Sequence, residues 1–322
     1  LNHPASPVPS GVIDERAHLH PVHGHPSRRR RRARRHLADP GFGDHFTDFM
    51  AHARWTEGSG WSEGEILPPY GPPLAISPSS AVLHYAQEIF EGLKAFRHED
   101  GSVWTFRPER NAARMQRSAQ RLALPELSAE DFLASLEALV AADEPWVPRT
   151  GGGETSLYLR PFMFANEDFL GVRASRTVDY YVIASPAGAY FPRGVQPLVV
   201  WVTDEYARAG AGGTGAAKCG GNYASSLLAK KEAGANGADE VMFLDSETHT
   251  CVDELSGDER LRHHVRREDP HPPVPDRIDP RGRHPRVDPP AGRRSGSRAR
   301  RAAPGPRGPG QGHRRRRDRR DV

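Results

Sequence analysis

The sequence predicts a mixed α/β or α+β protein made of two small lobes. Strand-like runs rich in Tyr, Val, Phe and Leu alternate along the chain with segments of helical periodicity. All the aromatic residues lie between Phe42 and Phe243, so this part of the chain carries the side chains that can fill a core. The 218 residues from 40 to 257 are enough for one domain or for two small ones.

Both ends of the chain differ in composition from this middle part. Residues 1–39 hold 8 arginines against 3 acidic residues, and residues 258–322 hold 20 arginines against 9. The middle part is acidic, with a formal net charge of −12. Because neither end has an aromatic residue to bury, folding could not offset the entropy of ordering it. We therefore expect a disordered basic arm over residues 1–36 and a disordered Arg-, Pro- and Gly-rich tail over residues 258–322.

The sequence carries no signal for a membrane, an oxidising compartment or a metal site. Its two cysteines, Cys219 and Cys251, form neither a disulfide framework nor a zinc-binding pattern. No apolar run approaches the ~18 residues that a membrane span needs, and the first residues lack the apolar segment of a secretory signal. These features predict a soluble, cytoplasmic protein without a bound metal.

The first predicted elements lie between residues 81 and 124. Apolar residues at positions 82, 85, 86, 89 and 90 follow a helical stripe, which predicts a helix over Ala81–Glu91. Leu93–Arg97 and Ser102–Arg107 alternate around an Asp-Gly pair, which predicts a β-hairpin. Pro108 suits the first turn of a following helix over 109–124. Four arginines line one face of that helix; most such faces are simply solvated, although one arginine could bind an anion.

Another helix and four strands follow, and a further helix lies between the last two of them. Ser128 and Asp131 form a capping-box pattern that predicts a helix over Ala129–Ala142. A turn is expected at Ser185–Gly188, and a helix over Tyr223–Ala233 should end at a Gly-Ala-Asn-Gly stretch. The strand-like runs are Ser156–Phe164, Val178–Ala184, Leu198–Thr203 and Glu240–Asp245.

One lysine stands out because of its neighbours. Lys218 lies in a run of very small residues, Gly210–Tyr223, in a chain with 4 lysines against 41 arginines. Small neighbours let a flat ligand or a phosphate approach the backbone, and an accessible lysine amine can form a Schiff base with a carbonyl. The simpler alternative, which the loop alone favours, is a flexible loop with an incidental lysine. A dinucleotide fingerprint and a P-loop are set aside, since no strand leads into the loop and Cys219 replaces the Ser or Thr.

Five motifs together carry a resemblance that no single one could. They are His84-Tyr-Ala-Gln-Glu-Ile-Phe-Glu-Gly-Leu-Lys-Ala-Phe96, Phe106-Arg-Pro-x-x-Asn-x-x-Arg-Met115, Ser156-Leu-Tyr-Leu-Arg-Pro161, Ser185-Pro-x-Gly-x-Tyr-Phe191 and Gly212-Gly-Thr-Gly-Ala-Ala-Lys-Cys-Gly-Gly-Asn-Tyr223. In their order and length they resemble the branched-chain amino acid aminotransferases, over about residues 37–254. The resemblance implies the fold type IV scaffold and pyridoxal 5′-phosphate (PLP) as cofactor.

The resemblance also implies roles for single residues. Lys218 would form the Schiff base with PLP and later move a proton between the substrate α-carbon and the cofactor. Tyr223 would hydrogen-bond the phenolic oxygen of the cofactor, Glu254 would pair with its ring nitrogen, and Arg114 would bind its phosphate. Arg160 would help hold the side-chain carboxylate of glutamate. The residues expected to line the substrate pocket are Tyr85, Phe90, Tyr158 and Tyr190.

The reaction that the resemblance implies is transfer of an amino group between leucine, isoleucine or valine and 2-oxoglutarate. The expected small-molecule partners are therefore branched-chain amino acids, 2-oxo acids and glutamate, and the expected assembly is a homodimer. Each of the residues named above also has a simpler alternative role. Arg114 could be one solvated arginine of several, and Tyr158 and Tyr190 could be ordinary core aromatics.

The resemblance ends directly after Glu254. Where the family continues with Gly-Met-Asn and an apolar strand, this chain becomes rich in Arg, Pro and Gly, and a shift of reading frame near codon 257 would explain that composition. We expect an N-terminal α/β domain over 37–190, a linker over 191–205 and an incomplete lysine-bearing domain over 206–257. A second domain without its partners would leave apolar faces exposed, so the expected activity is weak or absent.

Two other functions remain open from the sequence. One is a related type IV enzyme such as a D-amino acid aminotransferase. The other is a non-enzymatic protein that binds nucleic acid or another polyanion through its basic arms, for which Arg28–Arg32 and Arg314–Arg317 would supply the charge. Such binding would depend strongly on salt, and the lack of aromatic residues in both arms argues against specific base recognition.

Overall fold

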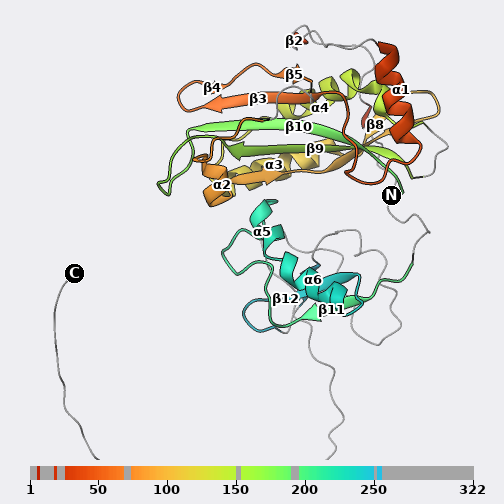
Figure 1. Cartoon of the computed structure of the whole chain (residues 1–322). Helices are drawn as coiled ribbons and strands as arrows, with labels where there is room; N and C mark the ends of the chain where they lie inside the picture. Colours follow the sequence, from red (N-terminus) through yellow and green to blue (C-terminus); the bar gives the residue numbers. More distant parts are fainter. Residues whose placement is uncertain are drawn as a thin grey trace, which may run out of the picture. The chain divides into compact units, whose positions relative to one another are not determined.

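The structure is a computed structural model that describes residues 6–7, 18–19, 26–68, 74–149, 154–189, 196–249 and 252–255 (Figure 1). All of them belong to the first of two compact units into which the chain divides, Leu1–Val287. No residue of the second unit, Asp288–Val322, is described. The predicted tail over 258–322 therefore lies outside the described residues. Within the described part of the chain, no helix is long and apolar enough to cross a membrane.

The larger of two sheets runs in the order β1-β8-β7-β9-β10-β3-β5-β2, with β6 beside β9 and β4 beside β3. Its described strands pair antiparallel, except that β2 and β5 are parallel. The strands are β1 Ser6–Pro7, β2 His18–Leu19, β3 Met50–Thr56, β4 Gly60–Trp61, β5 Glu65–Leu67, β6 Glu88–Phe90, β7 Leu93–Arg97, β8 Val103–Thr105, β9 Ser156–Ala165 and β10 Thr177–Ala187.

Two helices, α3 (Pro108–Arg121) and α4 (Ala129–Ala142), pack with this sheet into the main hydrophobic core (Figure 1). Successive side chains of a strand point to opposite faces, and alternate residues of β9 and β10 join this core. From β9 these are Leu157, Leu159 and Met163, and from β10 they are Val178, Tyr180 and Val182. The helices contribute Ala112, Met115, Phe132, Leu136 and Leu139, all of them almost fully buried.

The other residues of β9 and β10 form the opposite face of the sheet. Tyr158, Arg160 and Phe162 lie on this face of β9, and Tyr181 pairs with Phe162 across the strands. Phe90 of β6 pairs with Phe162 from the other side. The face is therefore aromatic, and the ring centroids of Phe162 and Tyr181 lie 5.6 Å apart.

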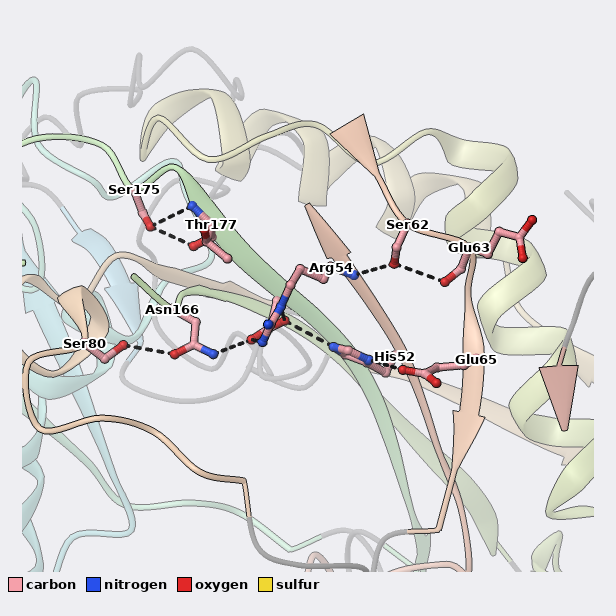
Figure 2. Close-up of polar contacts among 10 residues, drawn as sticks. His52, Arg54, Ser62, Glu63, Glu65, Ser80, Asn166, Ser175 and Thr177 are labelled. Carbon is pink, nitrogen blue, oxygen red and sulfur yellow. Dashed lines mark hydrogen bonds and ion pairs between the residues drawn. The ribbon is translucent and has the colours of Figure 1, made fainter. Parts of the chain in front are cut away.

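A polar cluster around one buried carboxylate crosses strands β10, β3 and β5 of the same sheet. Asp179 of β10, which is 1% exposed, accepts hydrogen bonds from Arg54 and His52 of β3 and from Asn166. Figure 2 shows these three donors converging, with His52 also bonded to Glu65 of β5. Burial by itself raises the pKa of Asp179, but the hydrogen bonds from His52, Arg54 and Asn166 lower it overall. The cluster thus ties β3, β5 and β10 together through charge.

The smaller sheet carries the lysine-bearing part of the chain. It consists of β11 (Val200–Thr203), β12 (Glu240–Leu244) and β13 (Val252–Leu255); β11 and β12 are parallel, and β12 and β13 are antiparallel. The chain passes from β11 to β12 through helices α5 (Gly220–Ala224) and α6 (Leu227–Ala235). A helical crossover is the usual link between parallel strands. The small core of this part is Ala229, Ala233, Val241 and Phe243.

The hairpin, the capping box and the four strands are confirmed. Arg97 of β7 pairs with Val103 of β8, and Gly101 takes a left-handed φ of 88° in the turn between them. The Asp131 amide donates to the Ser128 Oγ at 2.9 Å, at the start of α4. Strands β9 to β12 coincide with the four predicted runs to within three residues at each end.

The helix predicted over Ala81–Glu91 is wrong beyond its first turn. Helix α2 spans Ala81–Tyr85, Ala86 takes a left-handed φ of 47°, and the chain continues as strand β6. The apolar stripe fits a helix, but Phe90 and its neighbours pair with β9 instead. Long-range strand pairing therefore overrides the local period.

The turn predicted at Ser185–Gly188 is also wrong, because β10 continues to Ala187. Pro186 has no amide proton to donate to a neighbouring strand. It is tolerated because the pairing of β10 with β3 ends at Val182, whereas the pairing with β9 continues.

The helix predicted over Tyr223–Ala233 is divided at Ser225 and Ser226. The Ser225 Oγ donates to the Arg208 carbonyl at 2.8 Å, and the Ser226 Oγ donates to the Tyr223 carbonyl at 2.7 Å. Serine hydroxyls compete in this way for backbone groups and interrupt helices. The break leaves α5 as a short segment directly after the lysine.

Residues 26–37 form helix α1 (Pro26–Leu37), whereas the composition predicts disorder for residues 1–36. Ala33 is fully buried, and the Arg32 guanidinium donates to Asp48 at 3.0 Å. The same guanidinium lies 5.3 Å from the ring centroid of Trp146, in the 3-10 helix η1 (Glu144–Trp146). Arg32 is thus held by an acidic and an aromatic partner that are distant in the sequence. Together with strands β1 and β2, helix α1 corrects the expectation of disorder for the described residues of 1–36.

Candidate active site

Lys218 lies just before helix α5, and its backbone is anchored to the larger sheet and its helices. Its amide donates to the Ser118 Oγ of α3 at 2.9 Å, and its carbonyl accepts from the Phe90 amide of β6 at 3.0 Å. Asn222, which is 3% exposed, donates to the carbonyls of Thr214 and Ala217. The glycine-rich segment is therefore anchored to its surroundings by hydrogen bonds, in contrast to the flexible loop that the sequence left open.

The amine of Lys218 faces two aromatic side chains. Its Nζ donates to the Tyr223 Oη at 2.6 Å and lies 4.8 Å from the ring centroid of Phe90. The rings of Phe90 and Tyr223 are 5.0 Å apart. The structure thus brings together Lys218, Tyr223 and Phe90, which the sequence predicts as one site, from two separate parts of the fold.

Glu254 is connected to Tyr223 through Arg208, which contacts both residues. It sits on β13, opposite Phe243 of β12, and its carboxylate forms an ion pair with Arg208. The Arg208 side chain is 6% exposed, and its Cζ lies 5.2 Å from the ring centroid of Tyr223. A single buried cation therefore contacts both Glu254 and Tyr223.

Tyr158 and Arg160 lie on the aromatic face of β9, and Arg160 also contacts Phe90. An Arg160 terminal nitrogen donates to the Tyr158 Oη at 3.0 Å, and the Arg160 Cζ is 4.8 Å from the ring centroid of Phe90. A Cβ added to Gly92 would collide with the Tyr158 hydroxyl, so glycine is what allows this position of the tyrosine. Phe90 is therefore shared between the lysine and the residues predicted to bind substrate.

Arg114, the predicted phosphate ligand, forms a bidentate ion pair with Glu91. Its Nε and one terminal nitrogen lie 2.7 and 2.8 Å from the two Glu91 oxygens. Glu91 is fully buried and also accepts from Asn111 at 2.8 Å. Paired donors of this kind fix the plane of the guanidinium. Arg114 is thus held in one orientation on the inner part of α3.

Of the remaining two predicted pocket residues, the structure describes only Tyr85, which contacts residues of the 169–170 segment. The Tyr85 hydroxyl donates to the Leu170 carbonyl, and its ring lies 6.3 Å from Phe169. Tyr190 lies outside the described residues. No group of three or more His, Cys, Asp or Glu side chains that could hold a metal occurs in the described part of the chain.

Three residues that the sequence did not single out also shape this site: Glu88, Ser118 and Arg208. Glu88 accepts a hydrogen bond from the Gly220 amide at the start of α5. Burial raises the pKa of Glu88, against the opposing effects of that amide and of Arg160. Glu88 and Phe90 are two residues apart on one strand and therefore share a face. Predicting a strand for 88–90 would have placed both on the side of the lysine.

Comparison with known proteins connects this geometry to a family. A family model described as Amino-transferase class IV matches residues 88–256, which is more than half of the chain. The chain belongs to the class IV aminotransferases. This confirms the resemblance read from the five motifs and the mixed α/β, fold type IV architecture.

The curated relatives of this class IV aminotransferase include two actinobacterial proteins. A probable branched-chain-amino-acid aminotransferase of Streptomyces coelicolor is 58% identical over 221 residues, covering 69% of this chain and 60% of that protein. A branched-chain-amino-acid aminotransferase of Mycolicibacterium smegmatis is 56% identical over 221 residues, covering 69% and 59%. The chain therefore spans about three fifths of the length of the curated relatives it matches.

Solved structures of the family show the same architecture. The crystal structure of the Escherichia coli branched-chain amino acid aminotransferase matches with a TM-score of 0.51 and 26% identity, covering 64% of this chain and 62% of that one. The enzyme of Thermobaculum terrenum in its PLP form matches with a TM-score of 0.50 at 21% identity, over 65% and 62% of the two chains, and shows the fold alone.

Proposed function

We propose that this protein is a PLP-dependent branched-chain amino acid aminotransferase, which transfers an amino group between leucine, isoleucine or valine and 2-oxoglutarate. The observation that carries the proposal is the Lys218 Nζ held 2.6 Å from the Tyr223 Oη. Two arginines also lie at this site, Arg160 over the Phe90 ring and Arg208 over the Tyr223 ring. The high identity to relatives named as branched-chain aminotransferases supports the substrate class. Since the chain spans three fifths of those relatives, its own activity is part of the proposal.

The residues around Lys218 fit PLP as a ligand. Among the described residues, the Nε atoms of Arg160 and Arg208 are buried without a hydrogen-bond partner. An unsatisfied buried donor is costly, and anions such as phosphate and carboxylate are what guanidinium groups bind best. One of these arginines lies over Phe90 and the other over Tyr223, the two rings that the lysine amine also faces. Unpaired donors around a lysine amine suit an anionic carbonyl ligand.

Four residues would hold the cofactor in this proposal. Lys218 would bind the aldehyde carbon of PLP, Tyr223 its phenolic oxygen, Glu254 its ring nitrogen and Arg114 its phosphate. When bound, PLP supplies an electron sink that stabilises negative charge at the substrate α-carbon. The ion pair with Arg208 supports the role of Glu254, since an adjacent cation favours a carboxylate over a carboxyl group.

The protein's own contribution to the reaction would be to orient the amine and move a proton. Tyr223 accepts a hydrogen bond from the Lys218 Nζ and so restrains a side chain that is otherwise flexible. In its neutral form this amine can remove a proton from the substrate α-carbon and return it elsewhere. The Phe90 ring would cover one side of the amine.

The aromatic face of the larger sheet would provide the substrate pocket. Phe90 and Tyr158 offer apolar surface to a branched side chain, and Arg160 between them offers a cation to the side-chain carboxylate of glutamate. Tyr85 and Tyr190 would complete the pocket. A site that accepts both an aliphatic chain and a carboxylate suits an enzyme that alternates between two amino acids.

We also propose a homodimer located in the cytoplasm, and a division into a domain over 37–190, a linker over 191–205 and a lysine-bearing part from 206. The two separate sheets support the division. Exposed Leu83, Leu170 and Val172 near Tyr85 support an interface with a second copy, since such patches mark contact sites.

The proposed function is tested by incubating the purified full chain with PLP, 2-oxoglutarate and one amino acid at a time. We expect glutamate to form with L-leucine, L-isoleucine and L-valine. Glutamate formed with D-alanine and not with L-leucine would contradict the branched-chain assignment and favour a D-amino acid aminotransferase. A matched reaction with the Lys218→Ala variant controls for contaminating enzymes.

A further inference from the structure

Arg208 is the most deeply buried arginine of the lysine neighbourhood, with 6% of its side chain exposed. Its guanidinium makes two contacts that belong to different elements. It forms an ion pair with Glu254 of β13, and it lies over the ring of Tyr223 of α5 at 5.2 Å. Its backbone carbonyl also accepts from the Ser225 Oγ at the end of α5. Arg208 thus joins the loop, the helix and the strand.

The Arg208 guanidinium attracts the Glu254 carboxylate electrostatically. A carboxylate next to a buried guanidinium remains ionised, because the cation stabilises the charged form and the low-dielectric surroundings strengthen the attraction. Arginine is suited to such a place since it is always charged and its planar fork fixes the orientation of the acceptor. Arg208 therefore gives a fixed, charged partner to a carboxylate that lies on the short strand β13.

We propose that Arg208 is a positioning residue of this site, which fixes the orientation of the Glu254 carboxylate and braces the ring of Tyr223. The inference rests on the proposed function, in which Glu254 and Tyr223 contact the ring nitrogen and the phenolic oxygen of PLP. One buried cation then links the two residues that determine the charge of the pyridine ring. Its unpaired Nε is one further donor directed at no other described residue.

The test measures PLP binding to the full chain and does not depend on activity. The dissociation constant for PLP is measured by absorbance titration for the unmodified chain and for Arg208→Gln, Arg208→Lys, Glu254→Gln and the double variant Arg208→Gln/Glu254→Gln. Arg117→Gln is the matched control, because Arg117 is exposed on α3. Melting temperatures of the cofactor-free proteins report any loss of fold, and a pH titration of the bound-PLP absorbance reports the charge of the ring.

We expect Arg208→Gln to weaken PLP binding about tenfold, the size of one lost charge-assisted contact, and Arg117→Gln to leave it unchanged. In the Glu254→Gln background, Arg208→Gln should change the dissociation constant for PLP by less than roughly twofold, because Arg208 acts through Glu254. Arg208→Lys keeps the positive charge but loses the planar guanidinium. The pH titration of its bound-PLP absorbance should therefore match that of the unmodified chain, while its affinity for PLP should be lower.

Four outcomes overturn the inference. If Arg208→Gln binds PLP like the unmodified chain, Arg208 has no role in the site. If Arg208→Gln weakens PLP binding as much in the Glu254→Gln background, and the loss of affinity follows the loss of melting temperature, Arg208 is only a packing residue. If Arg208→Gln does not fold, the PLP affinity of Arg208→Lys is compared instead, and an affinity equal to that of the unmodified chain overturns the inference. If the unmodified chain binds no PLP in a Lys218-dependent manner, the proposed function itself fails and this inference fails with it.

Discussion

The Lys218 Nζ lies 2.6 Å from the Tyr223 Oη, although the two residues are five positions apart and only the tyrosine belongs to a helix. Anchoring of the lysine backbone to Ser118 and Phe90 turns its side chain toward α5, and the interruption of the helix at Ser225 and Ser226 keeps α5 short. The contact therefore depends on the larger sheet layer as well as on the lysine loop.

Replacing Tyr223 by Phe should weaken PLP binding about tenfold, because the hydroxyl that restrains the amine is lost. The ring stays, so the contact with Phe90 is kept and the melting temperature of the cofactor-free chain should hardly change. Absorbance titration and a thermal melt measure the two effects. Tyr206→Phe is the matched control, since the Tyr206 hydroxyl bonds to Glu232 away from the lysine. Equal PLP affinities for Tyr223→Phe and the unmodified chain would show that the hydroxyl has no role.

Replacing Gly92 by Ala should displace the Tyr158 hydroxyl, which a new Cβ would meet. If Tyr158 lines the substrate pocket, the KM for L-leucine should rise by about tenfold while the affinity for PLP stays the same. Steady-state kinetics and PLP titration separate these effects. A Cβ at Gly64 would meet only the His52 carbonyl at 4.0 Å, so Gly64→Ala is the control. A Gly92→Ala variant that loses PLP and keeps its KM would place Tyr158 at the cofactor instead.

Much of the fold follows from local signals. The hairpin at Gly101 and the capped start of α4 are encoded in a few neighbouring residues whose conformation has one favourable solution. Residues 86–90 could not be predicted in this way, because their apolar stripe suits a helix and only the partner strand β9 selects the extended form. The same applies to the helix over 26–37, in which Arg32 contacts Asp48 and Trp146 far along the chain.

The candidate site likewise contains residues that a local motif identifies and residues that only distant contacts identify. Lys218 and Tyr223 belong to one motif, so the sequence places them together. Arg208 has no local signal, since its importance comes from contacts with Glu254 on another strand and with the ring of Tyr223. Glu88 was missed because it was assigned to a helix, and in the structure its strand directs it to the Gly220 amide.

The Asp179 cluster predicts a pH dependence of stability on the acidic side. The pKa of Asp179 is lowered in the folded protein, so its carboxylate stabilises the fold above the unfolded value near 3.9, and this contribution is lost as the pH falls through the folded value. Asp179→Asn should lower the free energy of unfolding by about 3 kcal/mol at pH 7, because Arg54 and His52 lose a buried partner. Urea denaturation at pH 7 measures this, and Asp204→Asn, at an exposed position outside the cluster, is the control. A loss below about 1 kcal/mol would mean that water replaces the carboxylate.

His52 predicts the opposite pH dependence. Burial lowers the pKa of His52, but its hydrogen bonds to Asp179 and Glu65 raise it overall. A histidine with a raised pKa stabilises the fold fully below about pH 6.5, and the contribution is lost as the pH rises through the folded value. His52→Gln should therefore lower the melting temperature more at pH 6 than at pH 9. The exposed His98 supplies the control variant His98→Gln, and an equal loss for His52→Gln at both pH values would contradict a charged His52.

The family match ends at residue 256, where the composition of the chain changes. If residues 258–322 are read out of frame, a one-base shift after codon 257 should encode a Gly-Met-Asn stretch and then an apolar strand. Sequencing the gene across this codon and translating all three frames checks the prediction. Absence of such a continuation in every frame would exclude a frameshift, and binding of the tail to a polyanion with steep salt dependence would then be the function to test.

The central claim is that Lys218 is the cofactor-binding lysine, and reductive trapping tests it most directly. The full chain is incubated with PLP, reduced with borohydride and digested, and the modified lysine is identified by mass spectrometry. The account predicts modification at Lys218, its disappearance in Lys218→Ala, and little modification at the neighbouring Lys230 and Lys231 of α6. Modification mainly at Lys230 or Lys231, unchanged in Lys218→Ala, would contradict it.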